Sequence, residues 1–125
     1  MKIPEAKELL WINYSLTRGK GLPQGVTETN LVKAALLRPR SLFQGEELYP
    51  DAHSKTASLA EFIIKFRPFK SGNTATALAS GLLMLQRNGH TIGVEDEDIS
   101  LFSRQLDRGR FNFQDLVHWF RKVSK

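Results

Sequence analysis

Cysteine is absent from this chain of 125 residues. Its absence excludes a disulfide framework, a thiolate metal site and a cysteine nucleophile. Long apolar runs are absent too, because no stretch approaches the roughly 20 apolar residues that a membrane-spanning helix needs. The N-terminal residues include acids and lack the apolar segment of a signal peptide. From these absences we expect a cytoplasmic protein with no membrane partner.

Known metal and hydrolase motifs are also missing. His53, His90 and His118 lie far apart, and none has a second ligand at a metal-site spacing. We therefore predict structural or surface roles for the histidines and no metal site. No GxSxG, HExxH or Walker motif occurs. The acidic run at residues 95–98 lacks the spaced ligands of a calcium loop, so we interpret it as a solvated helix start.

Hydrophobic residues make up 41% of the chain and charged residues 25%, which is ordinary for a globular protein. The length fits one domain over residues 1–125. The net charge of +5 permits binding of an acidic protein segment, a phosphate or a nucleic acid. Nucleic acid is the least expected of these partners, because no recognition motif accompanies the basic residues.

Apolar residues at helical spacing predict an all-α fold of about six helices. These helices are expected near residues 4–18, 28–37, 52–66, 73–88, 97–107 and 113–123. Thr27 and Asp51 are the predicted N-caps of the second and third helices, and Asn112 forms a predicted capping box in the last. Trp11 and Trp119 lie on apolar stripes, so both are predicted to be core residues.

The rest of the chain is organised around the helix predicted at residues 73–88, which is apolar on nearly every face and therefore expected to be buried. Ser71, Asn73 or Thr74 can cap its start, and Gly72 allows a sharp turn before it. Such a turn leaves unpaired N–H groups that can hold an anion. A Gly-Asn pair before a helix is more often a simple capping turn, so both interpretations stay open here.

Residues 67–78, RPFKSGNTATAL, resemble the signature of the Fic/Doc family, HPFxDGNxRTAL. Three further blocks are similar to that family in the same order. They are residues 21–39, similar to GLPG and LLESALARP; residues 47–57, similar to YPDLFEKAA; and residues 83–89, similar to LLFLxxNG. The length and the blocks resemble Doc, the death-on-curing toxin, most. The resemblance implies the all-α Fic fold.

The resemblance also implies a reaction. Members of the family transfer part of a nucleoside triphosphate to a hydroxyl of a target protein, and Doc-like members transfer the terminal phosphoryl to a translation elongation factor. In the signature, the histidine is the base and the acid holds the metal. The Gly-Asn turn and the following basic residues bind phosphate oxygens.

This chain departs from the signature at the catalytic positions. Arg67 replaces the histidine, Ser71 replaces the acid, and Thr74 and Ala75 replace the basic pair. A guanidinium stays protonated at physiological pH and cannot act as a general base. We therefore predict a catalytically inactive member, or pseudoenzyme.

The pseudoenzyme prediction leaves two binding functions open. One is a phosphate or nucleotide, with ATP as a candidate ligand and magnesium not expected; its predicted anion-binding residues are Lys70, Gly72, Asn73 and Thr74. The other is a protein partner such as an antitoxin peptide, which Doc-type toxins receive as a helix in a surface groove.

An active Doc-type toxin is the alternative. It needs a base from elsewhere in the chain, and Asp51 and His53 are the candidates at the start of the preceding helix.

Overall fold

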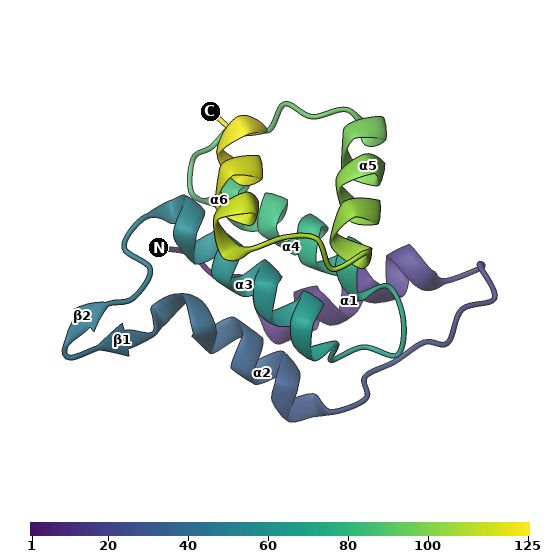
Figure 1. The fold of residues 1–125 in the computed structure, drawn as a ribbon. Coiled ribbons are helices and arrows are strands. Elements are labelled where there is room, and N and C mark those ends of the chain that lie inside the picture. Colours follow the sequence, from purple (N-terminus) through teal and green to yellow (C-terminus); the bar gives the residue numbers. More distant parts are fainter.

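A computed structural model describes residues 1–125, and most of its residues lie in helices (Figure 1). The helices are α1 (Ala6–Thr17), α2 (Thr29–Leu37), α3 (Ala52–Phe66), α4 (Asn73–Arg87), α5 (Asp96–Asp107) and α6 (Phe113–Lys122). A short 3-10 helix, η1 (Arg38–Arg40), and two strands, β1 (Leu42–Phe43) and β2 (Glu46–Glu47), lie between α2 and α3. The all-α prediction with six helices is confirmed. None of the helices has the length and apolar character that crossing a membrane would require.

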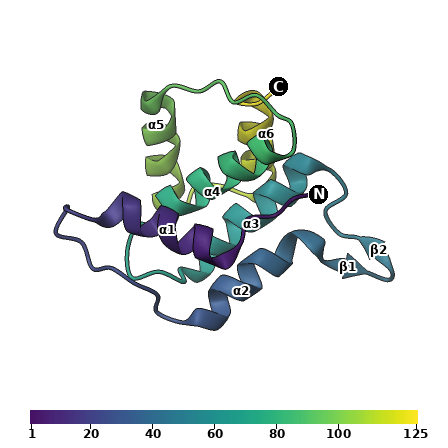
Figure 2. The same cartoon turned by 180° about the vertical axis from the view of Figure 1, so that it is seen from behind.

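Helices α3 and α4 pack against each other at the centre of the molecule, and the other helices surround this pair (Figures 1 and 2). Helices α2 and α6 pack on α3, whereas α1 and α5 pack on α4. One continuous apolar core joins these contacts. The prediction that the helix at residues 73–88 is central is therefore confirmed, and its two neighbours α1 and α5 determine what surrounds its start.

Helix α4 is packed tightly on one side and less completely on another. A Cβ on Gly81 would lie 2.5 Å from Cζ of the fully buried Phe120. Glycine in a helix interior costs up to about 1 kcal/mol relative to alanine, and here it permits the close approach of α6. Ala79 and Leu83 remain only partly buried on the side that faces α1. The helix is therefore buried on most of its faces but not on all.

The capping predictions are confirmed at two helices. The Asp51 carboxylate accepts a hydrogen bond of 2.7 Å from the Ser54 amide, and the Ser54 hydroxyl completes a capping box at α3. Asn112 and Asp115 form the corresponding box at α6. These caps depend only on residues three positions apart, so local sequence is enough to predict them.

The predicted cap at Thr27 is wrong. The N-cap of α2 is Glu28, and the Thr27 hydroxyl instead donates a 2.9 Å hydrogen bond to the Pro68 carbonyl. The Thr27 amide donates to the same carbonyl at 2.8 Å. Tertiary contact thus gives this threonine a partner some 40 residues away, and the contact ties the segment before α2 to the end of α3.

The two strands form a hairpin that the sequence pattern did not predict. Gln44 and Gly45 both have positive φ, 51° and 82°, as a tight two-residue hairpin turn requires. The hairpin is held to α3 by Lys55, whose buried ammonium donates to the Tyr49 carbonyl at 2.6 Å and to the Glu47 carboxylate at 2.9 Å. Strands of two residues are too short to give an alternating pattern.

The two tryptophans have different environments. Trp119 is buried and stacks on Phe102 with ring centroids 4.7 Å apart, which confirms the prediction for this residue. Trp11 is 63% exposed, so its prediction as a core residue is wrong. Leu9 supplies the buried contact of α1, and the apolar stripe of that helix is wider than the face that α4 covers.

Two of the three histidines lie closer together than their sequence positions indicate. The rings of His53 and His90 are 4.9 Å apart, and His53 Nε2 lies 2.9 Å from the Ser124 hydroxyl. That hydroxyl donates to the Phe120 carbonyl, so His53 Nε2 carries the proton of the shared bond. Burial lowers the pKa of His53, and the nearby charges of His90 and Arg121 lower it further. These contacts give His53 and His90 structural roles at the C-terminal end of the chain.

Candidate functional site

Residues 67–72 form the loop between α3 and α4, and together with Asn73, the first residue of α4, we call them the signature loop. It begins at Arg67, which ends α3 in the left-handed conformation with φ 48° and ψ 63°. Pro68 follows and disfavours helical dihedrals at the residue before it. The amide of Arg67 still donates to the Ile63 carbonyl at 3.0 Å, while its side chain is exposed. The guanidinium therefore stands at the surface beside the loop.

The loop is held in shape by one buried side chain and by α1. The Asn73 carboxamide accepts from the Phe69 amide at 3.0 Å and donates to the Phe69 carbonyl at 2.9 Å. The Asn13 side chain donates to the Ser71 carbonyl at 2.8 Å. Gly72 has φ 71°, and a Cβ there would lie 2.8 Å from the Thr17 methyl group. Glycine is therefore required for both its backbone conformation and its contact with α1.

The start of α4 differs from the side-chain caps predicted by the sequence. Gly72 is the N-cap, and no side chain caps the helix, so that prediction is wrong. The carboxamide of Asn73 binds the backbone behind it instead of the amides in front. The first helical bond is donated by the Thr76 amide to the Gly72 carbonyl at 2.9 Å, and the amides of residues 73–75 make no hydrogen bond. This is the geometry of the predicted anion cradle.

A small hollow of about 180 Å³ opens beside these amides. Residues of the signature loop and the first turn of α4 form one wall, and Ser103 and Asp107 of α5 form the other. The Thr74 hydroxyl donates a 2.5 Å hydrogen bond to the Asp107 carboxylate. Sequence reasoning missed Asp107, because it lies 33 residues from Thr74 and its local sequence carries no motif.

The Asp107 carboxylate affects what the hollow can bind. A negative charge near a helix N-terminus is favourable, and Asp107 already supplies one to α4 from within the chain. The same carboxylate repels a second anion that approaches the free amides. Arg67 lines the hollow and supplies the only cationic side chain there.

The predicted anion-binding residues are only partly available. The Asn73 carboxamide and the Thr74 hydroxyl are engaged with Phe69 and Asp107. Lys70 is exposed and its amide donates to the Gly25 carbonyl, so only its ammonium remains free to bind an anion. A phosphate could therefore bind to the turn at Gly72 and to the three free amides of residues 73–75.

The signature loop does not fit the metal and nucleotide that the family signature implies. The Ser71 hydroxyl, at the position of the metal-binding acid, donates to the Pro23 carbonyl at 2.5 Å. Ala75 presents a methyl group where a basic side chain is expected, and Asp107 adds negative charge beside the phosphate position. A magnesium ion would find one carboxylate, already hydrogen-bonded to Thr74.

Asp51 and His53 cannot supply the missing base. Both lie at the start of α3, whereas Arg67 follows its last residue. A helix of this length separates its two ends by about 20 Å at 1.5 Å per residue. The hypothesis that either residue acts at the signature loop is therefore wrong.

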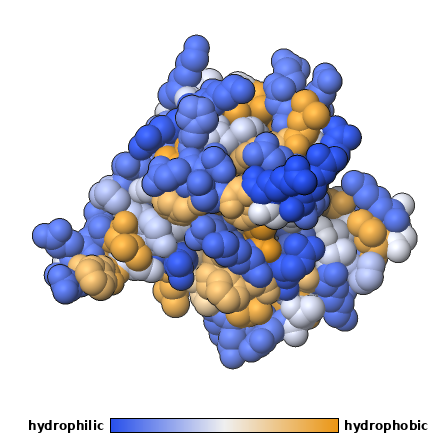
Figure 3. Space-filling model, in the orientation of Figure 1, coloured by the Kyte–Doolittle hydropathy of each residue, from blue (hydrophilic) through white to orange (hydrophobic).

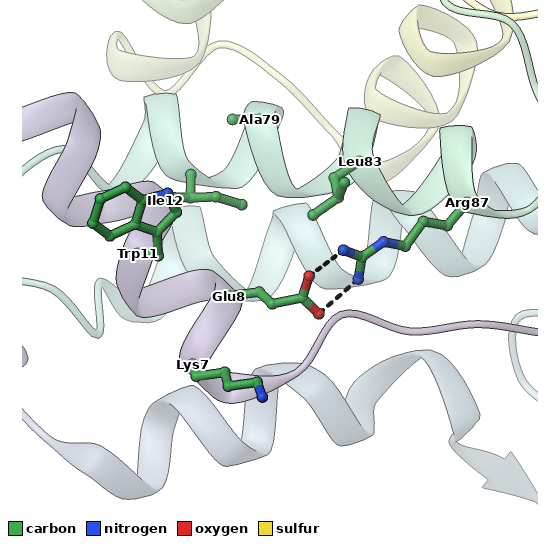
Figure 4. A pocket seen from close by; sticks show the side chains of 7 residues that line it. All are labelled: Lys7, Glu8, Trp11, Ile12, Ala79, Leu83 and Arg87. Carbon is green, nitrogen blue, oxygen red and sulfur yellow. Dashed lines mark hydrogen bonds and ion pairs between the residues drawn. The ribbon is translucent and has the colours of Figure 1, made fainter.

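A second and larger feature lies between α1 and α4, where a groove of about 600 Å³ runs along the two helices (Figure 4). We call it the α1–α4 groove. Trp11 and Ile12 line it from α1, and Ala79 and Leu83 line it from α4. Leu10 and Tyr14 are also exposed on α1, at 42% and 44%. The sequence pattern indicated an apolar stripe here but not that it would remain uncovered.

The end of the groove is closed by an ion pair. The Arg87 guanidinium donates a 2.6 Å hydrogen bond from Nη1 to Oε1 of the Glu8 carboxylate, and its Nη2 forms an ion pair with Oε2 (Figure 4). These interactions lower the pKa of Glu8 to about 2. Both groups stay ionised at neutral pH and compensate each other, so the groove presents mainly apolar surface.

Comparison with known proteins identifies one family. The sequence model of the Fic/DOC family matches residues 4–85, a span that runs from before α1 into the last turns of α4. It includes the signature loop and most of the α1–α4 groove. No curated protein matches the chain.

Proposed function

The chain belongs to the Fic/Doc family, and from this premise we propose that it is a Doc-like protein without transferase activity. In this proposal it acts by binding a protein partner in the α1–α4 groove. The partner is an acidic segment that folds as an amphipathic helix, as expected for an antitoxin peptide.

The signature loop supports the loss of catalysis. Arg67 cannot accept a proton from an attacking hydroxyl, and no histidine lines the hollow beside it. Loss of a general base alone costs on the order of 100- to 10,000-fold in rate. The substitutions Ser71, Thr74 and Ala75 remove the groups that hold a metal and neutralise phosphate charge in the signature.

The exposure of Trp11 is the observation that carries the proposed binding function. Its side chain is 63% exposed beside a groove of about 600 Å³. Large exposed apolar patches mark interaction sites, and tryptophan and tyrosine are enriched among the residues that dominate binding energy. Trp11 and Tyr14 lie side by side with ring centroids 5.7 Å apart and an angle of 30° between the rings, so they present one apolar surface.

The charge of the protein indicates the kind of segment that fits. The net charge is +5, and Lys7 lines the groove with an exposed ammonium whose one ion pair is a 3.7 Å surface contact with Glu5, while Glu8 is compensated by Arg87. An acidic helix with one apolar face would place leucine side chains between α1 and α4 and its acids towards Lys7. Such helix-in-groove binding needs no catalytic residue.

A peptide titration tests this function. The probe is a synthetic 20-residue amphipathic helix with leucine on one face and glutamate on the other, and a lysine-for-glutamate version serves as comparison. We expect the acidic peptide to bind and the basic version not to bind. Trp11→Ala should weaken binding by about 30-fold, since a central aromatic contributes about 2 kcal/mol or more. Isothermal titration calorimetry measures each affinity.

Phe43→Ala is the matched control. Phe43 is 64% exposed on the hairpin, far from the groove in both views of the fold (Figures 1 and 2), so its loss should change the affinity less than twofold. Equal binding of the two peptides, or equal effects of the two substitutions, would contradict the proposed groove.

Phosphate binding at the signature loop is a second candidate, supported by the free amides of residues 73–75 and by Arg67. The negative charge of the Asp107 carboxylate, which lines the same hollow, opposes phosphate binding. We expect Asp107→Asn to tighten the binding of inorganic phosphate several-fold, because the amide keeps a partner for Thr74 and removes the repelling charge. Backbone amide NMR shifts during a phosphate titration report the affinity at residues 74 and 75.

Asp98→Asn is the control for this substitution. Asp98 lies in the exposed first turn of α5, at the other end of the helix from Asp107, and its change alters the net charge equally. The loop candidate fails if neither the native chain nor Asp107→Asn shifts these amides, or if both substitutions have the same effect.

A further inference from the structure

The C-terminal end of α5 bears a second polar hollow, which we call the arginine hollow. Its volume is about 580 Å³, and Leu101, Arg104, Gln105, Arg108 and Arg110 line it. Strongly hydrophilic side chains gather over this end of α5 and the loop after it (Figure 3). It is separate from the hollow at the signature loop, which Ser103 and Asp107 line from a different face of the same helix.

The backbone brings the three guanidinium groups to this hollow. Arg104 and Arg108 are four residues apart, so they stand one above the other on α5. The Arg108 amide donates to the Arg104 carbonyl at 3.2 Å, and Gly109 then turns the chain with φ 71°. The turn brings Arg110 back beside the helix, where its carbonyl lies 3.5 Å from the Gln105 side-chain nitrogen.

No carboxylate compensates these charges. None of the three arginines takes part in an ion pair within 4.0 Å, whereas Arg87 and Arg121 each pair with an acid. The carboxylate of the neighbouring Asp107 is engaged with Thr74 on the other face of α5. The helix dipole favours cations near the end of α5, but Arg110 lies beyond the helix and gains little from that effect.

We propose that the arginine hollow binds a chain of two or three phosphate groups. Guanidinium groups bind phosphate oxygens through paired hydrogen bonds, and three of them match a multiply charged chain better than a single charge. The volume lies within the range of small-molecule sites, about 300–1,000 Å³. No aromatic side chain lines the hollow, and binding of single-stranded nucleic acid relies on such stacking.

Calorimetric titration with sodium tripolyphosphate at low salt tests the proposal. One variant carries Arg104→Gln, Arg108→Gln and Arg110→Gln. Its control carries Arg18→Gln, Lys20→Gln and Lys33→Gln at exposed cations without ion pairs, so that both variants lose three positive charges. We expect the arginine variant to lose at least about 10-fold in affinity and the control less than about threefold. Circular dichroism checks that both variants are folded.

A titration with ATP tests which molecule carries the phosphates. Binding of ATP with the same dependence on the three arginines indicates a nucleotide, and binding of tripolyphosphate alone indicates an inorganic chain; both support the proposal. Absence of heat with the native protein and either ligand overturns it. So does equal weakening in both triple variants, which would show only the effect of net charge. A single-stranded oligonucleotide that binds when tripolyphosphate does not would identify a nucleic-acid surface instead.

Discussion

Labelling of an elongation factor by this protein is expected to rise by at least about 100-fold when four signature positions are restored. The substitutions are Arg67→His, Ser71→Asp, Thr74→Lys and Ala75→Arg. The histidine supplies a base, the aspartate a metal ligand, and the two cations neutralise phosphate charge. Purified protein, magnesium and ATP labelled at either the α or the γ phosphate measure the transfer and identify the group that moves.

The local structure can accept the new side chains at positions 67 and 75, whereas Thr74 is buried and the Ser71 hydroxyl donates to the Pro23 carbonyl. Arg67 is in the left-handed conformation, which histidine adopts more readily than most residues. Ala75 is exposed, and a lysine at position 74 would lie beside the Asp107 carboxylate that Thr74 now contacts. That pairing would also compensate the Asp107 charge that opposes phosphate.

The variant with Ser71→Asp, Thr74→Lys and Ala75→Arg but with Arg67 retained is the control. It keeps the binding groups without the base and should remain close to background. Labelling by the native protein would contradict the proposed loss of catalysis. If the four-position variant is folded and binds ATP but does not label the elongation factor, the signature residues are not sufficient for transfer in this chain.

Replacement of the buried aromatic ring of α6 is expected to have the largest effect on stability. Phe120→Ala should lower the free energy of unfolding by about 3–5 kcal/mol, because it removes a large buried side chain and leaves a cavity. Phe120 is completely buried and fills the space that Gly81 leaves on α4. Single domains are stable by only about 5–15 kcal/mol, so this loss should be obvious in urea unfolding.

The same substitution at Phe43 is the comparison, since that ring is 64% exposed on the hairpin. It should change the free energy of unfolding by no more than about 0.5 kcal/mol. Similar losses at the two positions would mean that the packing of the Phe120 ring in the core contributes little to stability.

The helices and their boundaries were largely predictable. Apolar periodicity located all six, and the boxes at Asp51 and Asn112 marked two of the starts. These signals are local, because a helix and its cap involve residues three or four positions apart. Where a side chain found a distant partner, as Thr27 did at Pro68, the local prediction failed.

The candidate sites were predictable to different degrees. The resemblance at residues 67–78 indicated the signature loop and the four positions at which its residues differ from the family signature. It could not show that the carboxylate of Asp107 lies beside the start of α4, because two helices separated in sequence must pack before Thr74 and Asp107 meet. Arg104, Arg108 and Arg110 lie close together in the sequence, but only the turn at Gly109 placed all three around one hollow.

The sequence by itself determined the fold class, the family signature, and the absence of a histidine at the position of the base, since each depends on residue identity and local spacing. Tertiary structure decided which apolar and charged side chains remain exposed. Trp11 shows the reason: its apolar stripe predicted burial, but α4 covers only part of α1. Burial depends on what packs against a face, and a helix sequence does not contain that information.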